Sequence, residues 1–240
     1  MRKLGMIGGL SWVSTALYYE TINKEVARRM GGLHSAPLLL ESLDLAPVVA
    51  LQAKGQWDGA ADMLRQSAKR LAAAGAEGLI VCSNTAQKYE ESIAAAAGLE
   101  LIPIGRITAD RLAADGVKRA GLIGTAATMN DDFYRALIES RGIEVTVPEP
   151  AMMAEIDRII FEELVLGKIS RVSQRTLKTA ITNLAQTRNQ AVILGCTELV
   201  MLVDPLANVL PVYDTTALHA RAATNWILDG NDTGIGAGVT

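Results

Sequence analysis

The stretch "VILGCTELV", Val192 to Val200, places Cys196 at the end of an apolar run. The second of the chain's two cysteines stands in a near copy of that setting, "GLIVCSNTA", Gly78 to Ala86, where Cys82 follows the run directly. Short apolar runs bounded by small or polar residues are typical of strands buried on both faces of a parallel sheet. The two segments therefore predict two buried strands, each ending at a cysteine.

Further segments extend this pattern into an α/β fold. Six more apolar runs predict strands: "KLGMIGG", "PLLLES", "LELIPI", "RAGLIGT", "EVTVPE" and "NVLPVYD". Most of them alternate with helical patterns, of which "DGAADMLRQSAKRLAAAG" is the clearest, with Asp58 predicted to cap its start and Gly75 its end. Repeated strand-then-helix units predict parallel sheets.

The landmarks repeat along the chain. Gly8 and Gly124, each after a predicted strand, are 116 positions apart, and the two cysteines are 114 apart. This indicates two similar α/β halves of about 110 residues, a typical domain size. We expect residues 1–104 with 209–228 to form the first, 105–208 the second, and 229–240 a disordered tail. If the halves face each other across a pseudo-twofold axis, both cysteines meet in one cleft at the carboxyl ends of the strands.

Composition excludes several classes of partner. Two cysteines and the lack of a secretory leader pattern predict a cytoplasmic protein with reduced thiols. The apolar runs are far shorter than the roughly 20 residues of a membrane-spanning helix. The net charge is -3, and Lys and Arg are scattered along the sequence, so no basic patch for binding nucleic acid or anionic lipid is expected. A small molecule is the expected partner.

Two opposed thiols suit inversion at a carbon that carries an acidic hydrogen. One group removes the proton from one face, and the other returns a proton to the opposite face. A thiol has an ordinary pKa of about 8.5, so its environment can tune it for either role. We expect helices to begin directly after both cysteines, where their N-terminal amides would favour the thiolate. Hydrogen bonds to a carboxylate are expected from Ser83, Asn84, Thr85 and Thr197.

Other interpretations stay open at this point. A cysteine at the end of a buried strand is more often a small apolar residue, although the duplication favours function. A metal site is not expected, because His34 and His219 show no ligand spacing with the cysteines, and a redox pair lacks the C-x-x-C spacing. Two rival functions are a catalytically silent sensor of an amino acid or dicarboxylate and a related carbon-acid isomerase or decarboxylase.

An ordered set of motifs across residues 3 to 228 resembles a known family. The motifs are "MIGGLSWVSTALYYETIN", "GGLHSAPLLLESLD", "VCSNTAQK", "GTAATM", "ILGCTEL" and "PVYDTTALHA". They are similar to the aspartate/glutamate racemase family, in its cofactor-independent amino-acid racemase branch. The resemblance implies two Rossmann-like (flavodoxin-like) domains with a cleft between them, an amino-acid substrate, a homodimer, and no pyridoxal phosphate or metal.

The same resemblance assigns roles to particular residues. It implies that Cys82 and Cys196 are the two acid/base groups. It places the substrate's α-carboxylate and amino group at Ser83, Asn84, Thr85 and Thr197, and it places Ser11 and Thr125 along the cleft. Supporting roles are expected for Gln87, Glu198 and His219. For each of these three a packing or helix-stabilising role is the alternative.

The chain also departs from the family pattern. Val13 stands where close relatives tend to carry Glu, and Gln87 where His is usual. Members specific for acidic substrates hold the distal carboxylate with positive side chains. In "VVALQAKGQW", which supplies Gln52 to the expected site, only Lys54 offers a cation. The second expected position is acidic or apolar, at Glu162, Glu163 and Leu164. The substrate range therefore stays open between aspartate or glutamate and a broader set.

Overall fold

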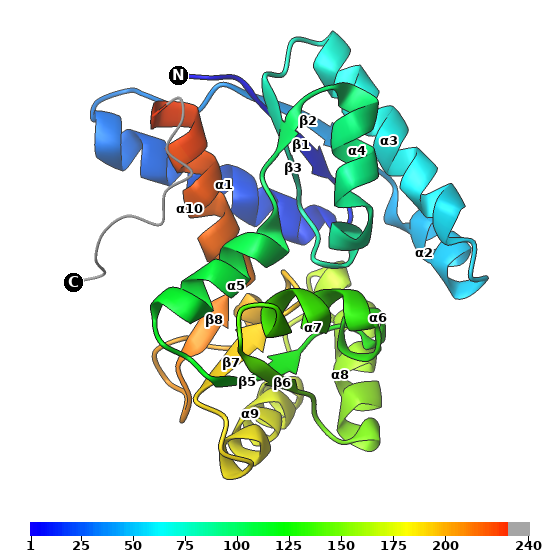
Figure 1. The fold of residues 1–240 in the computed structure, drawn as a ribbon, viewed down its shortest axis with the longest axis vertical. Helices are drawn as coiled ribbons and strands as arrows, with labels where there is room; N and C mark the ends of the chain where they lie inside the picture. The colour runs from blue at the N-terminus through cyan, green and yellow to red at the C-terminus, as the bar shows by residue number, and fades with distance from the viewer. Residues whose placement is uncertain (230–240) are drawn as a thin grey trace.

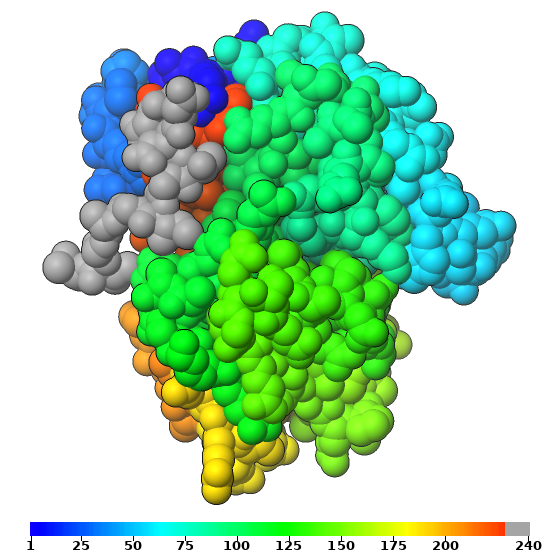
Figure 2. All heavy atoms as spheres, viewed as in Figure 1, coloured from blue at the N-terminus to red at the C-terminus, as the bar shows by residue number. Residues whose placement is uncertain are grey.

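The structure, a computed structural model, describes residues 1–229 and divides them into two α/β halves (Figure 1). In Figure 2 the halves form two lobes, one with the blue and cyan segments and one with the yellow and most of the green segments. Apart from Asp229, the tail predicted for 229–240 lies outside the described residues. Within 1–229, no helix has the length and apolar character needed to cross a membrane.

Each half contains a four-stranded parallel sheet. The first has the order β2 (Leu38–Ser42), β1 (Leu4–Gly8), β3 (Gly78–Val81), β4 (Glu100–Leu101). The second has the order β6 (Glu144–Thr146), β5 (Arg119–Ile123), β7 (Ala191–Leu194), β8 (Val212–Asp214). The two orders are the same when the strands of each half are counted along the chain. The predicted parallel strands and the predicted repeat are confirmed.

Helices cover both faces of each sheet. In the first half they are α1 (Trp12–Met30), α2 (Leu45–Ala53), α3 (Trp57–Ala73), η1 (Thr85–Tyr89) and α4 (Glu90–Ala97). The rest of the chain forms α5 (Ile104–Ala114), α6 (Ala126–Asn130), α7 (Asp132–Glu139), α8 (Pro150–Glu162), η2 (Leu164–Leu166), α9 (Arg171–Gln186), η3 (Leu199–Met201) and α10 (Thr215–Asp229). Of these, α10 packs in the core of the first half. The elements labelled η are short 3-10 helices.

The predicted cap of α3 is wrong. Gln56 precedes the helix without a side-chain cap, and Asp58 lies inside the first turn, where its charge still suits the helix dipole. Gly75, after the last turn, has φ +91°, a backbone conformation that glycine adopts without strain, as predicted.

Alternating strand side chains separate the layers. Met6 belongs to the core under α1 and α10, whereas the next residue, Ile7, packs with α3 and α4. In the second sheet Leu122 packs with α5 and α7, and Ile123 with α8 and α9. Successive side chains of a strand point to opposite faces, so each strand contributes to two cores. Each half is thus a three-layer sandwich whose two central strands, β1 and β3 or β5 and β7, contribute apolar side chains to both faces.

The last two elements connect the halves. The predicted division places residues 209–228 in the first domain, but β8 pairs with β7 in the second sheet. The chain then returns as α10, whose Trp226 is buried against the first sheet and donates from Nε1 to Glu100 at 2.9 Å. The Arg2 guanidinium lies 3.8 Å from the centre of the Trp226 ring. The helix α10 therefore packs in the same core as strand β1, at the start of the chain.

We predict that Gly78→Ala destabilises the protein by about 2 to 3 kcal/mol. A Cβ at Gly78 would lie 2.3 Å from the buried Trp226 ring, so the ring or the strand must move. The control is Gly59→Ala in α3, where the nearest atom is the end of the Leu51 side chain at 3.2 Å and alanine favours the helix. Chemical denaturation measures both. Equal stability of the two variants would contradict the packing role of Trp226.

Candidate active site

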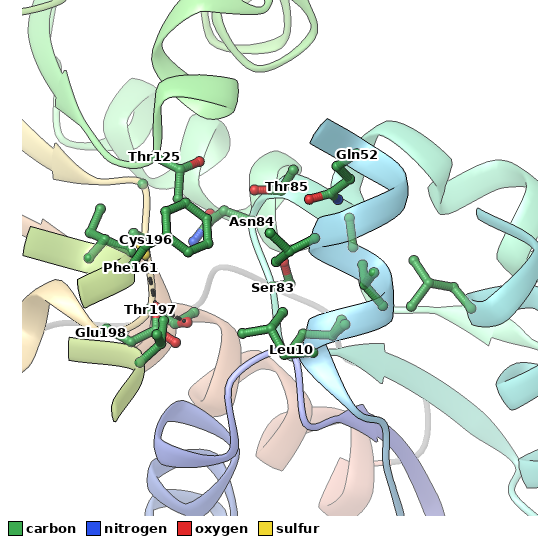
Figure 3. A pocket seen from close by; sticks show the side chains of 18 of the residues that line it. Leu10, Gln52, Ser83, Asn84, Thr85, Thr125, Phe161, Cys196, Thr197 and Glu198 are labelled. Carbon is green, nitrogen blue, oxygen red and sulfur yellow. Dashed lines mark hydrogen bonds between the residues drawn. The ribbon is translucent and has the colours of Figure 1, made fainter. Parts of the chain in front are cut away.

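A pocket lies where the carboxyl ends of the two sheets meet (Figure 3). Its lining surrounds about 610 Å³ of space, part of it open to solvent. The polar lining comes mainly from the segments after the strands and includes Gln52, Ser83, Asn84, Thr85, Thr125, Thr197 and Glu198. The apolar lining includes Leu45, Val48 and Val49 of α2, Ile160 and Phe161 of α8, and Val165 of η2. Ligands of open α/β sheets bind at this edge.

Cys196 lines the pocket and is hydrogen-bonded to a buried carboxylate. Its Sγ–H donates to Oε2 of Glu198 at 2.8 Å, and Thr197 Oγ1 donates to the same oxygen at 3.0 Å. Glu198 is only 3% exposed, and its other oxygen, Oε1, is buried without a partner among the described residues. A buried acceptor with unused capacity is typical of a site that receives a ligand or proton.

The environment of both thiols favours the protonated form. Burial raises the pKa of Cys82 and of Cys196, and the negative charge of Glu198 raises both further. The expectation that helix N-termini would favour the thiolate is wrong. Cys82 is followed by the 3-10 helix η1 and Cys196 by η3, so neither thiol lies directly at the start of an α-helix. The charge of Glu198 thus acts on both thiols.

The two cysteines occupy different positions relative to the ends of their strands. The amide of Cys82 donates to the Ile7 carbonyl at 3.0 Å, and in the second sheet the equivalent bond, to Ile123, comes from Gly195 at 2.7 Å. Cys82 therefore corresponds to Gly195, and Cys196 lies one residue further along. As a result Cys196 is 8% exposed in the pocket wall, whereas Cys82 is 0% exposed and packs in the core with Tyr18. Cys82 is not among the lining residues, although the next residue, Ser83, is.

Asn84 connects the two halves by hydrogen bonds. Its Nδ2 donates to Thr215 Oγ1 at 2.9 Å, and its Oδ1 accepts from Tyr134 at 2.9 Å. Thr215, at the start of α10, in turn donates to the Leu194 carbonyl at the end of β7 at 2.7 Å. Hydrogen bonds thus fix both the nitrogen and the oxygen of the Asn84 side-chain amide.

A second polar contact joins the halves through threonines. Thr85 and Thr125 each lie within hydrogen-bonding distance of Thr128 Oγ1, at 3.3 and 3.0 Å. Thr128, Tyr134 and Thr215 were not predicted as site residues from the sequence. Only Thr128 had a local signal, because it stands three residues after Thr125, which caps α6 and accepts from its amide.

Besides Cys82, four predicted site residues lie outside the main pocket. Lys54 is exposed at the C-terminal end of α2, and Ser11 is buried before α1 with no hydrogen-bond partner for its Oγ among the described residues. Gln87 contacts Glu90 and accepts from the Gly105 amide at 2.9 Å. Gln87 and His219 line a smaller adjoining space that also reaches Ser83.

His219 is held as a neutral imidazole. Its Nε2 lies 2.9 Å from the Ile102 carbonyl, an acceptor, so Nε2 carries the proton and Nδ1 accepts from the Tyr18 hydroxyl at 2.8 Å. Burial lowers the pKa of His219 to about 4. Both ring nitrogens are thus used in hydrogen bonds within the core of the first half, which supports a packing role for His219.

Among residues 1–229, no three His, Cys, Asp or Glu side chains form a group suited to a metal ion. The predicted independence from metal and pyridoxal phosphate stays a prediction. The chemical groups that line the pocket are the Cys196 thiol, the Glu198 carboxylate and neutral hydrogen-bonding side chains.

Comparison with known proteins places the chain in a family. Residues 7–223 match the family model described as Asp/Glu/Hydantoin racemase, so the chain belongs to that family. A crystal structure of a candidate Asp/Glu racemase from Yersinia pestis is 44% identical, with a TM-score of 0.86 over 95% of this chain and 100% of that one. An aspartate racemase homologue from Pyrococcus horikoshii is 30% identical, with a TM-score of 0.77 over 92% and 96%.

A curated relative matches over a shorter region. The glutamate racemase of Persephonella marina is 28% identical over 167 residues, which are 67% of this chain and 62% of that protein. The match thus spans less than two thirds of that racemase. The two-domain α/β fold expected from the family resemblance is confirmed.

We predict a pH dependence of stability that comes from His219. The unfolded chain takes up a proton near pH 6.5 and the native state only near 4, so the stabilisation is complete above 6.5 and is lost as the pH falls toward 4. The loss amounts to about 3 kcal/mol. Denaturation between pH 4 and 7 should show this slope in the wild type and a weaker one in His219→Gln. Substitution of the exposed His34 by Gln is the control, and an unchanged slope in His219→Gln would refute the assignment.

We also predict that Glu198→Gln makes Cys196 more reactive near neutral pH. Removing the adjacent negative charge lowers the pKa of the thiol and raises the thiolate fraction. Alkylation of Cys196 by iodoacetamide, followed by peptide mass spectrometry from pH 7 to 10, should shift to lower pH. Glu162→Gln, at an exposed position on α8, should leave the profile unchanged. The same profile in wild type and Glu198→Gln would contradict the coupling.

Proposed function

We propose that this protein is a cofactor-independent amino-acid racemase in which Cys82 and Cys196 exchange protons with the α-carbon of the substrate. One observation carries the proposal: two thiols, one from each half, follow equivalent strands, and the charge of Glu198 raises the pKa of both. Membership in the racemase family supports the same reaction class.

The reaction requires one thiolate and one thiol on opposite faces of the α-carbon. The thiolate takes the α-proton, and the electron pair of the broken C–H bond moves into the substrate carboxylate. The second thiol then donates its proton to the other face, so the carbon is inverted and the two sulfurs have exchanged protonation states. The reverse direction uses the same residues in exchanged roles. No net proton or electron is gained or lost.

Neutral donors supply the stabilisation that this intermediate needs. Charge accumulates on the substrate carboxylate when the α-proton leaves, and hydroxyl and amide donors fixed in advance stabilise such charge without reorganising. Ser83 and Thr85 line the pocket with hydroxyl groups, and Asn84, held between Tyr134 and Thr215, has a second Nδ2 hydrogen to donate. The Thr197 hydroxyl joins these donors when it turns from Glu198 to the substrate. These residues form the proposed carboxylate-binding side of the pocket.

Glu198 is the proposed proton acceptor for the Cys196 thiol. The 2.8 Å hydrogen bond already points the Sγ–H at Oε2, so proton transfer needs no rearrangement. Before a substrate binds, the carboxylate is a much weaker base than the thiolate, so the proton stays on the sulfur. The α-ammonium group of an incoming amino acid supplies a positive charge and makes a thiolate favourable. Cys82 directly precedes Ser83 of the pocket wall but is itself buried in the core, so the proposal requires a movement at the end of β3 that brings its sulfur to the substrate.

The experiment follows α-proton exchange in heavy water by NMR with purified protein and each common L- and D-amino acid. We expect deuterium to enter the α-position of both enantiomers of the substrate, together with inversion. Cys82→Ala and Cys196→Ala should each reduce inversion by roughly 100- to 10,000-fold, the usual contribution of an acid or base. Circular dichroism confirms that the variants are folded, and His34→Gln is the matched control.

Three outcomes would overturn the proposal in different ways. Full racemisation by Cys82→Ala would remove the two-thiol mechanism. Binding of an amino acid without any exchange would favour the sensor. Release of carbon dioxide from a substituted malonate, with no amino-acid exchange, would favour the decarboxylase.

A further inference from the structure

One wall of the pocket is built from hydrocarbon side chains. Leu45, Val48, Val49 and Gln52 follow one another at helical spacing, so a single face of α2 is directed to the pocket. The second half contributes Ile160, Phe161 and Val165. Figure 3 shows Phe161 and Gln52 on opposite sides of the cavity. The polar residues after the strands and this apolar wall divide the pocket into two chemically different parts.

The pocket has one formal charge, and it is negative. Among the described lining residues there is no Lys, Arg or His, and Glu198 is the only acidic one. Lys54, the one cation expected near the site, is exposed beyond the last turn of α2 and does not line the pocket. Nothing in the lining can neutralise a second carboxylate on a substrate.

Two basic side chains on the flanking elements are already paired. Lys88 of η1 lies 2.5 Å from Asp131. Arg158 of α8 forms ion pairs with Glu155, Glu162 and Glu163 at 2.9 to 3.1 Å. Recruiting either cation into the pocket would break these contacts and leave carboxylates without their partner. The local charge distribution therefore opposes an acidic side chain.

From this arrangement we propose that the substrates are amino acids with an uncharged, apolar side chain, such as leucine or methionine. The inference rests on the proposed racemase function and assigns its substrate class. The α-carboxylate meets the hydroxyl and amide donors, the α-ammonium group is attracted by Glu198, and the side chain lies between α2 and α8. A distal carboxylate in the same place would lose its water, gain no cation and be repelled by Glu198.

The test compares kcat/KM for α-proton exchange of leucine and methionine with that of aspartate and glutamate. We expect a preference of at least roughly 100-fold for the neutral amino acids, since a hydrophobic pocket discriminates strongly when a charge must be buried. Val49→Arg places a cation on the half-buried α2 face and should reduce the leucine-to-glutamate ratio at least tenfold. Leu33→Arg, at a fully exposed loop position, adds the same charge as a control and should leave the ratio unchanged.

The outcomes separate this inference from the proposed function. Faster exchange of aspartate or glutamate than of leucine would refute the substrate class and leave the racemase intact. No exchange of any amino acid would refute the racemase itself. Should Val49→Arg fail to fold, Leu45→Arg tests the same wall one helical turn earlier, and an unchanged ratio in a folded variant would contradict the role of α2.

Discussion

The hydrogen bonds of Asn84 are the constraint on which the arrangement of the two halves depends. Its side chain joins the segment after β3 to Tyr134 of α7 and to Thr215 at the start of α10. Leaving a buried amide unpaired costs about 1 to 3 kcal/mol for each lost partner, so the halves cannot separate at this point without penalty. Because Asn84 comes two residues after Cys82, the same bonds hold the first thiol close to the second half. These bonds help to hold together the two strand ends that form the pocket.

Glu198 links the electrostatics of the pocket to its proposed chemistry. A carboxylate that is 3% exposed and bonded to a thiol keeps that thiol protonated while no cation is present. The described lining of the pocket supplies no positive side chain. The ammonium group of the substrate is therefore the positive charge that can offset the negative charge of a thiolate. Under the proposed mechanism, thiolate formation is thereby coupled to the arrival of an amino acid, and the lack of a second cation restricts which amino acid is accommodated.

Much of the fold could be predicted because its signals are local. Strands buried on both faces produce short apolar runs, and each predicted run corresponds to a strand from β1 to β8. The failures concern the positions at which helices begin. Asp58 is a good cap, but the turn at Gln56 lets the helix begin before it. The polar residues after both cysteines resemble helix starts, yet the chain forms 3-10 turns there, because Asn84 and Glu198 bond to other parts of the site instead of capping a helix.

The sequence by itself determined the two α/β halves, the position of each cysteine at the end of a strand, and the polar residues that follow. These depend on residue type and spacing along one segment. Only the tertiary structure decided that Cys196 lines the pocket while Cys82 lies behind it, since a shift of one residue in strand register separates them. It also decided that the apolar face of α2 lines the pocket and that Lys54 does not. The direction of a side chain around a helix at an interface is set by packing between distant segments, and no local pattern specifies it.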